Sequence, residues 1–428
     1  MFTIDKIKSS IQSNKTLVNG SLFSIFSFVN KGFGFILLMV LAGFISPGEY
    51  GYLSLFNTVI MFVGYFRALS TEGYLSVAYF REGESGIKNT ISCVFTTLFI
   101  FSVLLLLTLV LYGGGLATKL DLPLNILYLC LPIAFFSLFS NLILDYVRIR
   151  EKVGIYGILS CGNAFLNFVL SILLVKNVNT GWEGRVYAEV ICSVLFGLIG
   201  LFWFIRGKFI SLPNLQYWKQ MLIWGIPLIP HLATQFFRQG CDRYIINSSH
   251  TIDDVGLFSF ALTLANIISM IGFGFNQSNG VDIYKVLGNK EISNEKKRVK
   301  LANQRRIIRK IYIVSTVVVM VFGYLLVPMI LPKYSGAMNY FLILSIYSLG
   351  ICFYLLDTNY LFFYKKTKNI MYVTFSSAIL HLLLSIALTR YSLLITCGIY
   401  CLTQLLVVIV IRRLALKELN KELVIANC

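Results

Sequence analysis

The sequence predicts an all-α, polytopic integral membrane protein with about twelve transmembrane helices. Of its 428 residues, 57% are hydrophobic and 13% are charged, and the mean hydropathy is +0.77. Soluble domains carry about 25% charged residues, so this chain has more apolar surface than a soluble fold can hide. Its apolar residues form continuous runs of about 20 residues, the length of a transmembrane helix. A transmembrane β-barrel would instead show alternating segments of about ten residues.

Twelve apolar runs follow one another along the chain. In lipid the backbone must satisfy its own polar groups, so each run is expected to form a helix. No sizeable soluble domain is expected on either side of the membrane. The runs cover approximately residues 17–45, 53–79, 89–112, 124–147, 154–175, 185–205, 221–246, 255–275, 311–331, 339–364, 370–389 and 392–411.

The basic residues are distributed unevenly over the two sides of this map. Alternate segments, starting with the N-terminus, hold 28 of the 37 Lys and Arg residues. The opposite side holds Lys119, Lys176, Arg185, Lys333 and Arg390. Cytoplasmic loops carry the excess of Lys and Arg, so both termini are expected in the cytoplasm and the number of helices is expected to be even. Topology thus explains the net charge of +18, and no nucleic-acid partner is expected.

The longest basic segment runs from Lys285 to Lys310. It has two readings. It is either a solvated cytoplasmic linker or a segment that docks on anionic lipid headgroups.

No cleaved leader, disulfide framework, metal site or bound cofactor is expected. The first fifteen residues are polar and precede a long apolar run without a small-residue cleavage site. The nine Cys are scattered, mostly inside apolar runs, and the closest pair, Cys397 and Cys401, has no matching Cys or His cluster.

The two halves of the chain resemble each other. The matches occur in the same order at nearly constant offset, and together they predict two six-helix bundles over residues 1–209 and 210–428. Parallel repeats of this kind are typical of transporters, so a substrate path is expected between the halves. The matching stretches are 46–54 with 251–259, Leu144-Asp145 with Leu356-Asp357, and Leu166 to Ile172 with Leu380 to Ile386.

Four cationic side chains fall inside predicted helices: Lys31, Arg67, Arg238 and Arg243. At the centre of a bilayer each would cost about 2.5–3.5 kcal/mol on insertion scales. They are therefore expected to face a wet interior or a bound anion, and they form the candidate substrate-binding set, a cationic cavity. The alternative for each is a structural tie to a carbonyl or an acid of another helix, which is most plausible for Arg243 near the outer end.

Two of these arginines have acids nearby in the sequence. Arg238 and Asp242 are four apart, so a regular helix would place them as neighbours on one face. Arg67 and Glu72 are five apart, so a regular helix would place them on different sides. Pro227 and Pro230, which precede Arg238 in the same segment, are expected to bend it.

Five further residues are candidates for coupling transport to a proton or sodium gradient: Glu72, Asp145, Asp242, Asp357 and His381. Asp145 and Asp357 are repeat-related and precede basic turns, so the alternative is an ion pair with the neighbouring turn. The alternative for His381 is a hydrogen-bonded packing histidine. The membrane potential is a further candidate driving force.

Several motifs are absent from the sequence. It holds no G-x-x-x-x-G-K-[ST] phosphate-binding loop, so the chain has no ATP motor of its own. It also lacks the HExxH and GxSxG constellations of hydrolases. With no large loop to hold sugar chemistry, the chain is not expected to be an enzyme.

Several stretches together resemble the Wzx-type flippases of bacterial polysaccharides. Lys31 belongs to the first such stretch, which continues into the run LAGFISPGEYG. The stretches are residues 41–51, 148–152, 156–158, 181–185, 225–231, 242–246 and 255–256. The resemblance spans the chain and thins out after about residue 280.

This resemblance implies membership of the superfamily that includes multidrug exporters, with a MATE-like fold of two six-helix bundles and alternating access. The implied cargo is an undecaprenyl-diphosphate-linked oligosaccharide repeat unit of O antigen, the polymer of lipopolysaccharide, or of capsule. The implied location is the bacterial cytoplasmic (inner) membrane, with polysaccharide polymerase or chain-length proteins as candidate partners. Such a cargo suits cations for the diphosphate and polar residues such as Asn163, Asn167 and Tyr354 for the sugar.

Two other functions compete with this one. A cation-coupled drug exporter of the same fold is the main alternative, but its cavity should be lined by acids and aromatic residues. A membrane enzyme acting on lipid-linked sugars is the second alternative, and it should carry a large external loop.

Overall fold

The computed structural model describes residues 22–23, 25–30, 32–177, 180–289 and 291–425. Within these ranges every regular element is a helix. The chain divides into two compact units, one made of Met1–Ile45 and Leu55–Ala233, the other of Ser46–Ser54 and Thr234–Cys428. The division expected from the repeat, after residue 209, is a different boundary, and it stays a prediction.

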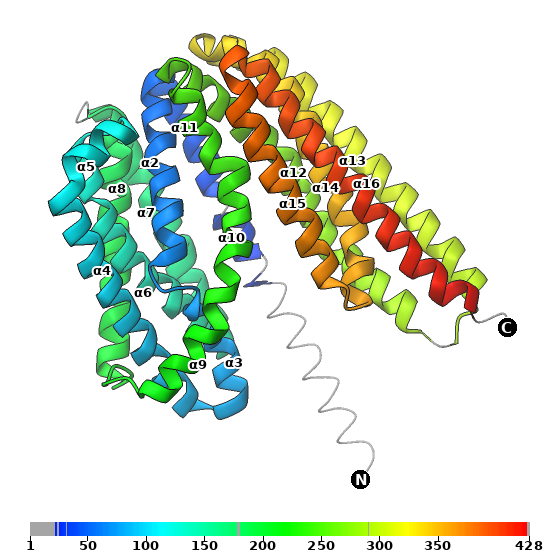
Figure 1. Ribbon diagram of the computed structural model, residues 1–428, viewed down its shortest axis with the longest axis horizontal. Helices are drawn as coiled ribbons and strands as arrows, with labels where there is room; N and C mark the ends of the chain where they lie inside the picture. Colours follow the sequence, from blue (N-terminus) through cyan, green and yellow to red (C-terminus); the bar gives the residue numbers. More distant parts are fainter. Residues whose placement is uncertain (1–21, 24, 31, 178–179, 290, 426–428) are drawn as a thin grey trace. The chain divides into compact units, whose positions relative to one another are not determined.

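The first unit is a helical bundle (Figure 1). After a first helix, Ile25–Phe44, it contains most of α2 and the elements up to the start of α10. The elements are α2 (Pro47–Phe66), η1 (Thr71–Gly73), α3 (Tyr74–Glu82), α4 (Glu84–Leu120), α5 (Leu124–Tyr128), α6 (Cys130–Ile149), α7 (Val153–Asn177), α8 (Trp182–Arg206), α9 (Leu215–Gly225), η2 (Ile226–Leu228) and α10 (Ile229–Gln235).

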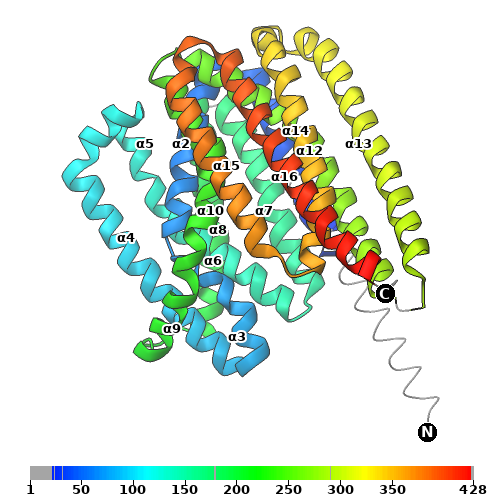
Figure 2. The ribbon, with the colours of Figure 1, turned by 45° about the vertical axis from the view of Figure 1, so that its right-hand side comes forward.

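The second unit contains the remaining helices, which Figure 2 shows from a second side. A five-residue π-helical turn opens it, directly after α10. The elements are η3 (Phe236–Gly240), α11 (Cys241–Asn247), α12 (Ile252–Gly288), α13 (Asn294–Ile330), η4 (Pro332–Ala337), α14 (Met338–Phe363), α15 (Thr367–Leu388), η5 (Thr389–Tyr391) and α16 (Leu393–Ile425).

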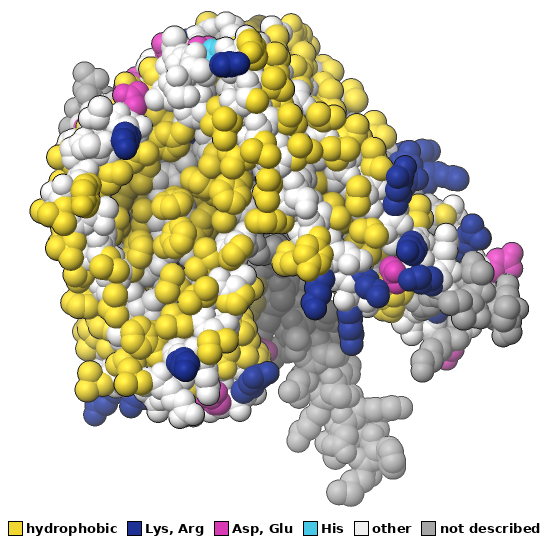
Figure 3. All heavy atoms as spheres, in the orientation of Figure 1, with side chains coloured by type: hydrophobic (Ala, Val, Ile, Leu, Met, Phe, Trp, Pro, Cys, Tyr) yellow, Lys and Arg dark blue, Asp and Glu magenta, His cyan; other side chains and the backbone are white. Residues whose placement is uncertain are grey.

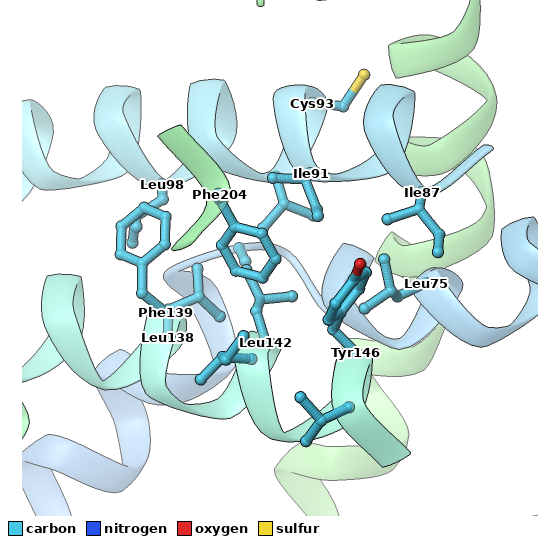
Figure 4. Close-up of a cluster of buried hydrophobic side chains, with 14 of the residues drawn as sticks. Leu75, Ile87, Ile91, Cys93, Leu98, Leu138, Phe139, Leu142, Tyr146 and Phe204 are labelled. Atoms are coloured by element: carbon cyan, nitrogen blue, oxygen red, sulfur yellow. The ribbon is translucent and has the colours of Figure 1, made fainter. Parts of the chain in front are cut away.

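A buried apolar cluster holds α3, α4, α6 and α8 together in the first unit (Figure 4). Its α4 members, Ile87, Ile91, Val94 and Leu98, recur at i, i+4, i+7 and i+11, so they form one face of a helix. Phe204 of α8 packs against this face and is fully buried. One face of α4 therefore anchors the bundle.

Large apolar side chains also cover wide areas on the outside of the molecule (Figure 3). On α4, Val110, Leu111 and Tyr112 are 62%, 69% and 68% exposed. A soluble protein would not leave such a continuous apolar surface in water. The exposed surface is therefore suited to lipid, as the composition predicts.

Twelve membrane crossings are expected from the sequence. Among the described residues, ten helices are long and apolar enough to cross a membrane, or eleven if α2 and the segment Thr71–Glu82, bent by 60°, count as one. The remaining expected crossing, residues 221–246, is divided among five short elements, α9 to α11. Pro227 lies in the 3₁₀ turn η2 and Pro230 is the second residue of α10, so the regular helix is interrupted where the prolines lie.

The two repeat-related turns pack against each other reciprocally within the second unit. An added Cβ on Gly51 would lie 2.3 Å from the carbonyl oxygen of Ile252, and one on Gly256 would lie 1.7 Å from that of Pro47. Gly51 aligns with Gly256 and Pro47 aligns with Ile252, so each turn makes the same contact on the other. A two-fold axis produces contacts of this self-complementary kind.

Both turns also begin their helices in the same way. The hydroxyl of Ser46 accepts from the backbone N–H of Glu49, whose carboxylate accepts from the N–H of Ser46. Thr251 and Asp254 form the equivalent capping box at the start of α12. Two orphan N–H groups are satisfied at each helix end, which fixes where both helices start.

Candidate functional site

A polar cavity of about 190 Å³ lies in the first unit, between the first helix, α7 and α8. Its polar lining consists of Asn30, Asn163, Asn167 and Arg185. Asn30 donates to the hydroxyl of Ser160 at 2.8 Å and to its carbonyl oxygen at 3.2 Å. The other two asparagines are among the three residues that the sequence predicts for sugar contacts; the third, Tyr354, does not line this cavity.

Arg185 brings a positive charge to this cavity, although the sequence places it near the outer end of a helix. It pairs with Glu189 one turn further along α8, at 3.3 Å, and its Nη1 is buried without a hydrogen-bond partner. The cavity therefore combines amide groups, which bond sugar hydroxyls, with an unsatisfied guanidinium N–H.

Arg67 lies directly after α2, where the regular helix has ended. Leu69 and Ser70 adopt left-handed backbone conformations, with φ of 50° and 60°, so the chain turns sharply before η1. The regular helix does not continue between Arg67 and Glu72, so the expectation that they face different sides, which assumed one regular helix, stays a prediction. The Arg67 guanidinium also donates to the hydroxyl of Ser137 on α6, and its Nε is buried without a partner.

Arg238 lies at the centre of the π-helical turn η3. Its Nη2 donates to the side-chain carbonyl of Gln404 on α16 at 2.7 Å, and its guanidinium lies 5.8 Å from the ring centre of Tyr347 on α14. Its Nε is buried without a partner. Two neutral side chains thus hold this cation, which leaves its charge uncompensated by a contacting acid.

Asp242 does not pair with Arg238, so the expected i,i+4 neighbourhood is wrong. A π turn adds one residue to the helix, and this insertion rotates Asp242 away from the face of Arg238. Asp242 instead accepts from Nε2 of His381 on α15, at 2.7 Å, and both side chains are fully buried. The structure thus brings together two candidate coupling residues that lie far apart in the sequence.

The other ring nitrogen of His381 lies 3.3 Å from the hydroxyl of Thr403, which itself donates to the carbonyl oxygen of Ile399. The ring of Tyr400 packs edge-on against the imidazole, with 4.5 Å between ring centres. A hydroxyl that already donates its proton is placed to accept one. Both ring nitrogens of His381 therefore lie near polar partners, Asp242 on one side and Thr403 on the other.

Arg243 donates hydrogen bonds to a neighbouring residue of its own segment and to a residue of α12. Its Nη1 donates to the carbonyl oxygen of Gln239 at 2.6 Å, and its Nε donates to the hydroxyl of Ser259 on α12 at 3.2 Å. Both acceptors are neutral groups of the second unit. The tie expected as the alternative is to a carbonyl or an acid of another helix; the carbonyl here belongs to the same segment and the group on α12 is a hydroxyl.

Asp145 and Asp357 each form an ion pair with an arginine. Asp145 pairs with Arg148 of the basic turn that follows it, as the alternative reading expects. Asp357 is buried and pairs with Arg305 of α13 at 2.8 Å, so its partner comes from another helix and not from the following turn. Each of the two repeat-related aspartates thus forms an ion pair, but the arginine comes from the same helix for Asp145 and from another helix for Asp357.

Lys31 lies outside the described residues. Of the other candidates, the structure joins Asp242 with His381, whereas Arg67, Arg238 and Arg243 are held by neutral groups. Sequence reasoning missed the neutral partners Ser137 and Gln404. Gln404 offers a signal in retrospect, because it is an isolated amide within an otherwise apolar stretch of α16.

Comparisons with known proteins agree with this architecture. The sequence profile of the family described as "Polysaccharide biosynthesis protein" matches residues 17–278. Protein 1 of the Lsg locus of Haemophilus influenzae is 22% identical over 376 residues, which cover 83% of this chain and 86% of that protein. A second H. influenzae protein, described as a membrane protein, is 22% identical over 373 residues, covering 85% and 88%.

Two solved structures are similar over nearly the whole chain. The inward-facing conformation of a multidrug resistance MATE family transporter of the MOP superfamily matches with a TM-score of 0.74, at 13% identity, covering 93% of this chain and 95% of that one. An outward-facing conformation matches with a TM-score of 0.63, at 15% identity, covering 94% and 95%. The chain therefore has the MATE fold and belongs to the polysaccharide biosynthesis protein family of multi-pass membrane proteins.

Proposed function

We propose that this protein is a flippase for undecaprenyl-diphosphate-linked oligosaccharide repeat units of O antigen or capsule. It moves them from the cytoplasmic to the outer leaflet of the bacterial cytoplasmic membrane by alternating access. The observation that carries the proposal is Arg238, a cation within the expected crossing 221–246 whose side-chain interactions, within the described part of the chain, are with the neutral Gln404 and Tyr347. A family of polysaccharide biosynthesis and a transporter fold supply the context.

An arginine in this state is suited to a diphosphate. A guanidinium is planar and always charged, and its fork of donors matches phosphate oxygens. Gln404 uses one donor of Arg238, and Nε remains without a partner. Since the cost of an unpaired charge in the membrane interior is several kcal/mol, binding an anion there would relieve it.

The cavity in the first unit supports the sugar part of the proposed cargo. Amide side chains both donate and accept, as sugar hydroxyls require, and three asparagines line this cavity. Drug cations would be expected to meet acids there, whereas the charged lining residue is Arg185. Because Glu189 pairs with Arg185, this cavity supports the polar, sugar part of the cargo, and the anionic part of the proposal rests on Arg238.

Two sources of energy fit the charges. Moving negative charge out of a negative-inside cell gains about 2.3 kcal/mol per charge per 100 mV. A proton is a candidate coupling ion at Asp242 and His381, because these two ionisable side chains are fully buried and in direct contact. Asp145 and Asp357 are weaker candidates, because each is neutralised by an arginine.

The test is removal of the gene followed by complementation. The amount of surface glycan is scored together with the leaflet in which lipid-linked repeat units accumulate. We expect loss of surface glycan, with intact repeat units stranded on the cytoplasmic leaflet. A polymerase or chain-length protein would act after this step, so its own loss should leave repeat units on the outer leaflet.

A variant pair makes the test specific to the site. Arg238→Gln should fail to restore surface glycan, whereas Arg390→Gln, which changes an exposed arginine, should restore it. Normal surface glycan in the deletion strain, together with raised drug sensitivity, would contradict the proposal and favour the drug exporter of the same fold.

A further inference from the structure

A second concentration of positive charge lies in the second unit, where α13 begins and α16 ends. Dark-blue side chains gather at this end (Figure 3). Two adjoining cavities of about 210 and 330 Å³ open there, and both are lined by Arg305, Arg309 and Arg412. Arg306 and Lys310 complete the lining of the larger one. We call these five residues the basic pocket.

The basic pocket contains far more positive than negative charge. Its lining holds five cations and a single acid, Asp357. Asp357 is already held by Arg305, at 2.8 Å. Within the described part of the chain, Arg306 and Lys310 form no ion pair. The pocket thus has a net surplus of four charges, which selects for an anion.

An apolar surface continues from the basic pocket along α13. Directly after Lys310, the side chains of Ile313, Val314, Val317 and Val321 are 41%, 61%, 52% and 49% exposed. An α-helix rises about 1.5 Å per residue, so the twelve steps from Arg309 to Val321 cover about 18 Å. This is close to the depth of one leaflet of hydrocarbon, about 15 Å.

We propose that the basic pocket binds the phosphate-bearing headgroup of an anionic phospholipid, whose acyl chains lie along the exposed apolar face of α13. The positive-inside distribution predicts that this end faces the cytoplasm, where anionic lipid attracts Lys and Arg. A free phosphate would use the charges alone and would leave the adjoining apolar face unexplained. The lipid accounts for both features.

The proposal also revises one reading of the sequence. The segment from Lys285 to Lys310 is not a linker along its whole length, because Asn294 already begins α13. Its last basic residues lie on that helix and share a cavity with Arg412, which follows more than a hundred residues later. A fold that gathers these charges around one cavity provides a specific site.

The experiment measures lipid retained by the purified full-length protein. Phosphatidylglycerol or cardiolipin is added to phosphatidylcholine-containing micelles, and bound lipid per chain is measured by native mass spectrometry. The pocket variant carries Arg306→Gln, Arg309→Gln and Arg412→Gln. The matched control carries Arg298→Gln, Lys300→Gln and Arg413→Gln, which remove the same charge from the same two helices outside the pocket.

We expect the pocket variant to lose affinity for the anionic lipid on the order of 100-fold, since each basic side chain at an anionic surface contributes a factor of roughly five. The control should stay within about twofold of the parent, since its residues do not line the cavity. Equal losses in both variants would overturn the proposal, because the attraction would then be general. Complete displacement of the lipid by an equal concentration of inorganic phosphate would also overturn it.

This binding assay needs no transport. Its failure would leave the proposed flippase activity untouched, and loss of that activity would leave the lipid site untouched.

Discussion

Arg67 and Arg238 lie in different compact units, and both occupy a point where a membrane-spanning segment departs from the regular α-helix. Arg67 follows the end of α2, and Arg238 lies in a π turn. Arg67 keeps an acid nearby, Glu72, whereas Arg238 has lost its sequence neighbour Asp242 to His381. The difference teaches that, where a regular helix is interrupted, residue spacing in the sequence no longer predicts which acid lies beside a buried cation.

The largest expected effect is that of removing His381, the histidine with which Asp242 is paired. His381→Leu leaves a buried carboxylate without its partner, and removing one member of a buried pair costs about 3–5 kcal/mol. We expect a marked drop in the unfolding temperature of the purified protein, followed by tryptophan fluorescence in detergent. His250→Gln is the control, because His250 bonds only a backbone carbonyl oxygen, that of Thr389. Equal stability of the two variants would show that the buried pair contributes little.

The next largest effect tests the comparison between Arg67 and Arg238. Arg238→Met should reduce surface glycan in the complementation assay about 10- to 100-fold, because a hydrogen bond to a charged group contributes about 1.5–3 kcal/mol. Arg67→Met should reduce it less, since an acid, Glu72, lies only five residues further along the chain. A larger loss at Arg67 than at Arg238 would reverse the assignment of the primary anion contact.

A smaller effect is expected from the group that positions Arg238. Gln404→Leu removes the amide that accepts from Nη2, and the guanidinium then loses its fixed orientation. We expect surface glycan to fall about fivefold, a cost of about 1 kcal/mol, the usual net contribution of a hydrogen bond. Gln404→Glu should be worse than Gln404→Leu, because a carboxylate would compete with the phosphate. A Glu variant that exports normally would argue against anion binding at Arg238.

The smallest effect belongs to the partner of Arg67. Ser137→Ala removes a hydroxyl that accepts from Arg67 and donates to the carbonyl oxygen of Ile133. We expect a loss of about 1 kcal/mol in unfolding free energy, with surface glycan close to normal, because Glu72 remains. Ser140→Ala on the same helix is a matched control. A strong loss of export in Ser137→Ala alone would give Arg67 a role equal to that of Arg238.

The sequence by itself determined that lipid surrounds the protein, that its secondary structure is helical and that its two halves resemble each other. Apolar runs of about 20 residues require helices in lipid, and nearly all of the expected spans are present as single long helices. Capping residues and glycines at equivalent places in the two halves marked the turns that pack reciprocally. These features are local, so periodicity and residue type are enough to predict them.

Only the tertiary structure decided how the polar residues within the membrane are paired. If both segments were regular helices, the sequence would place Asp242 beside Arg238 and would place Glu72 on a different side from Arg67. Each segment contains one irregular turn. Beyond such a turn, the number of residues between two side chains no longer gives the angle between them around the helix axis, so neither prediction applies. The partners Gln404, His381 and Arg305 come from helices far along the chain, and packing against those helices selected them.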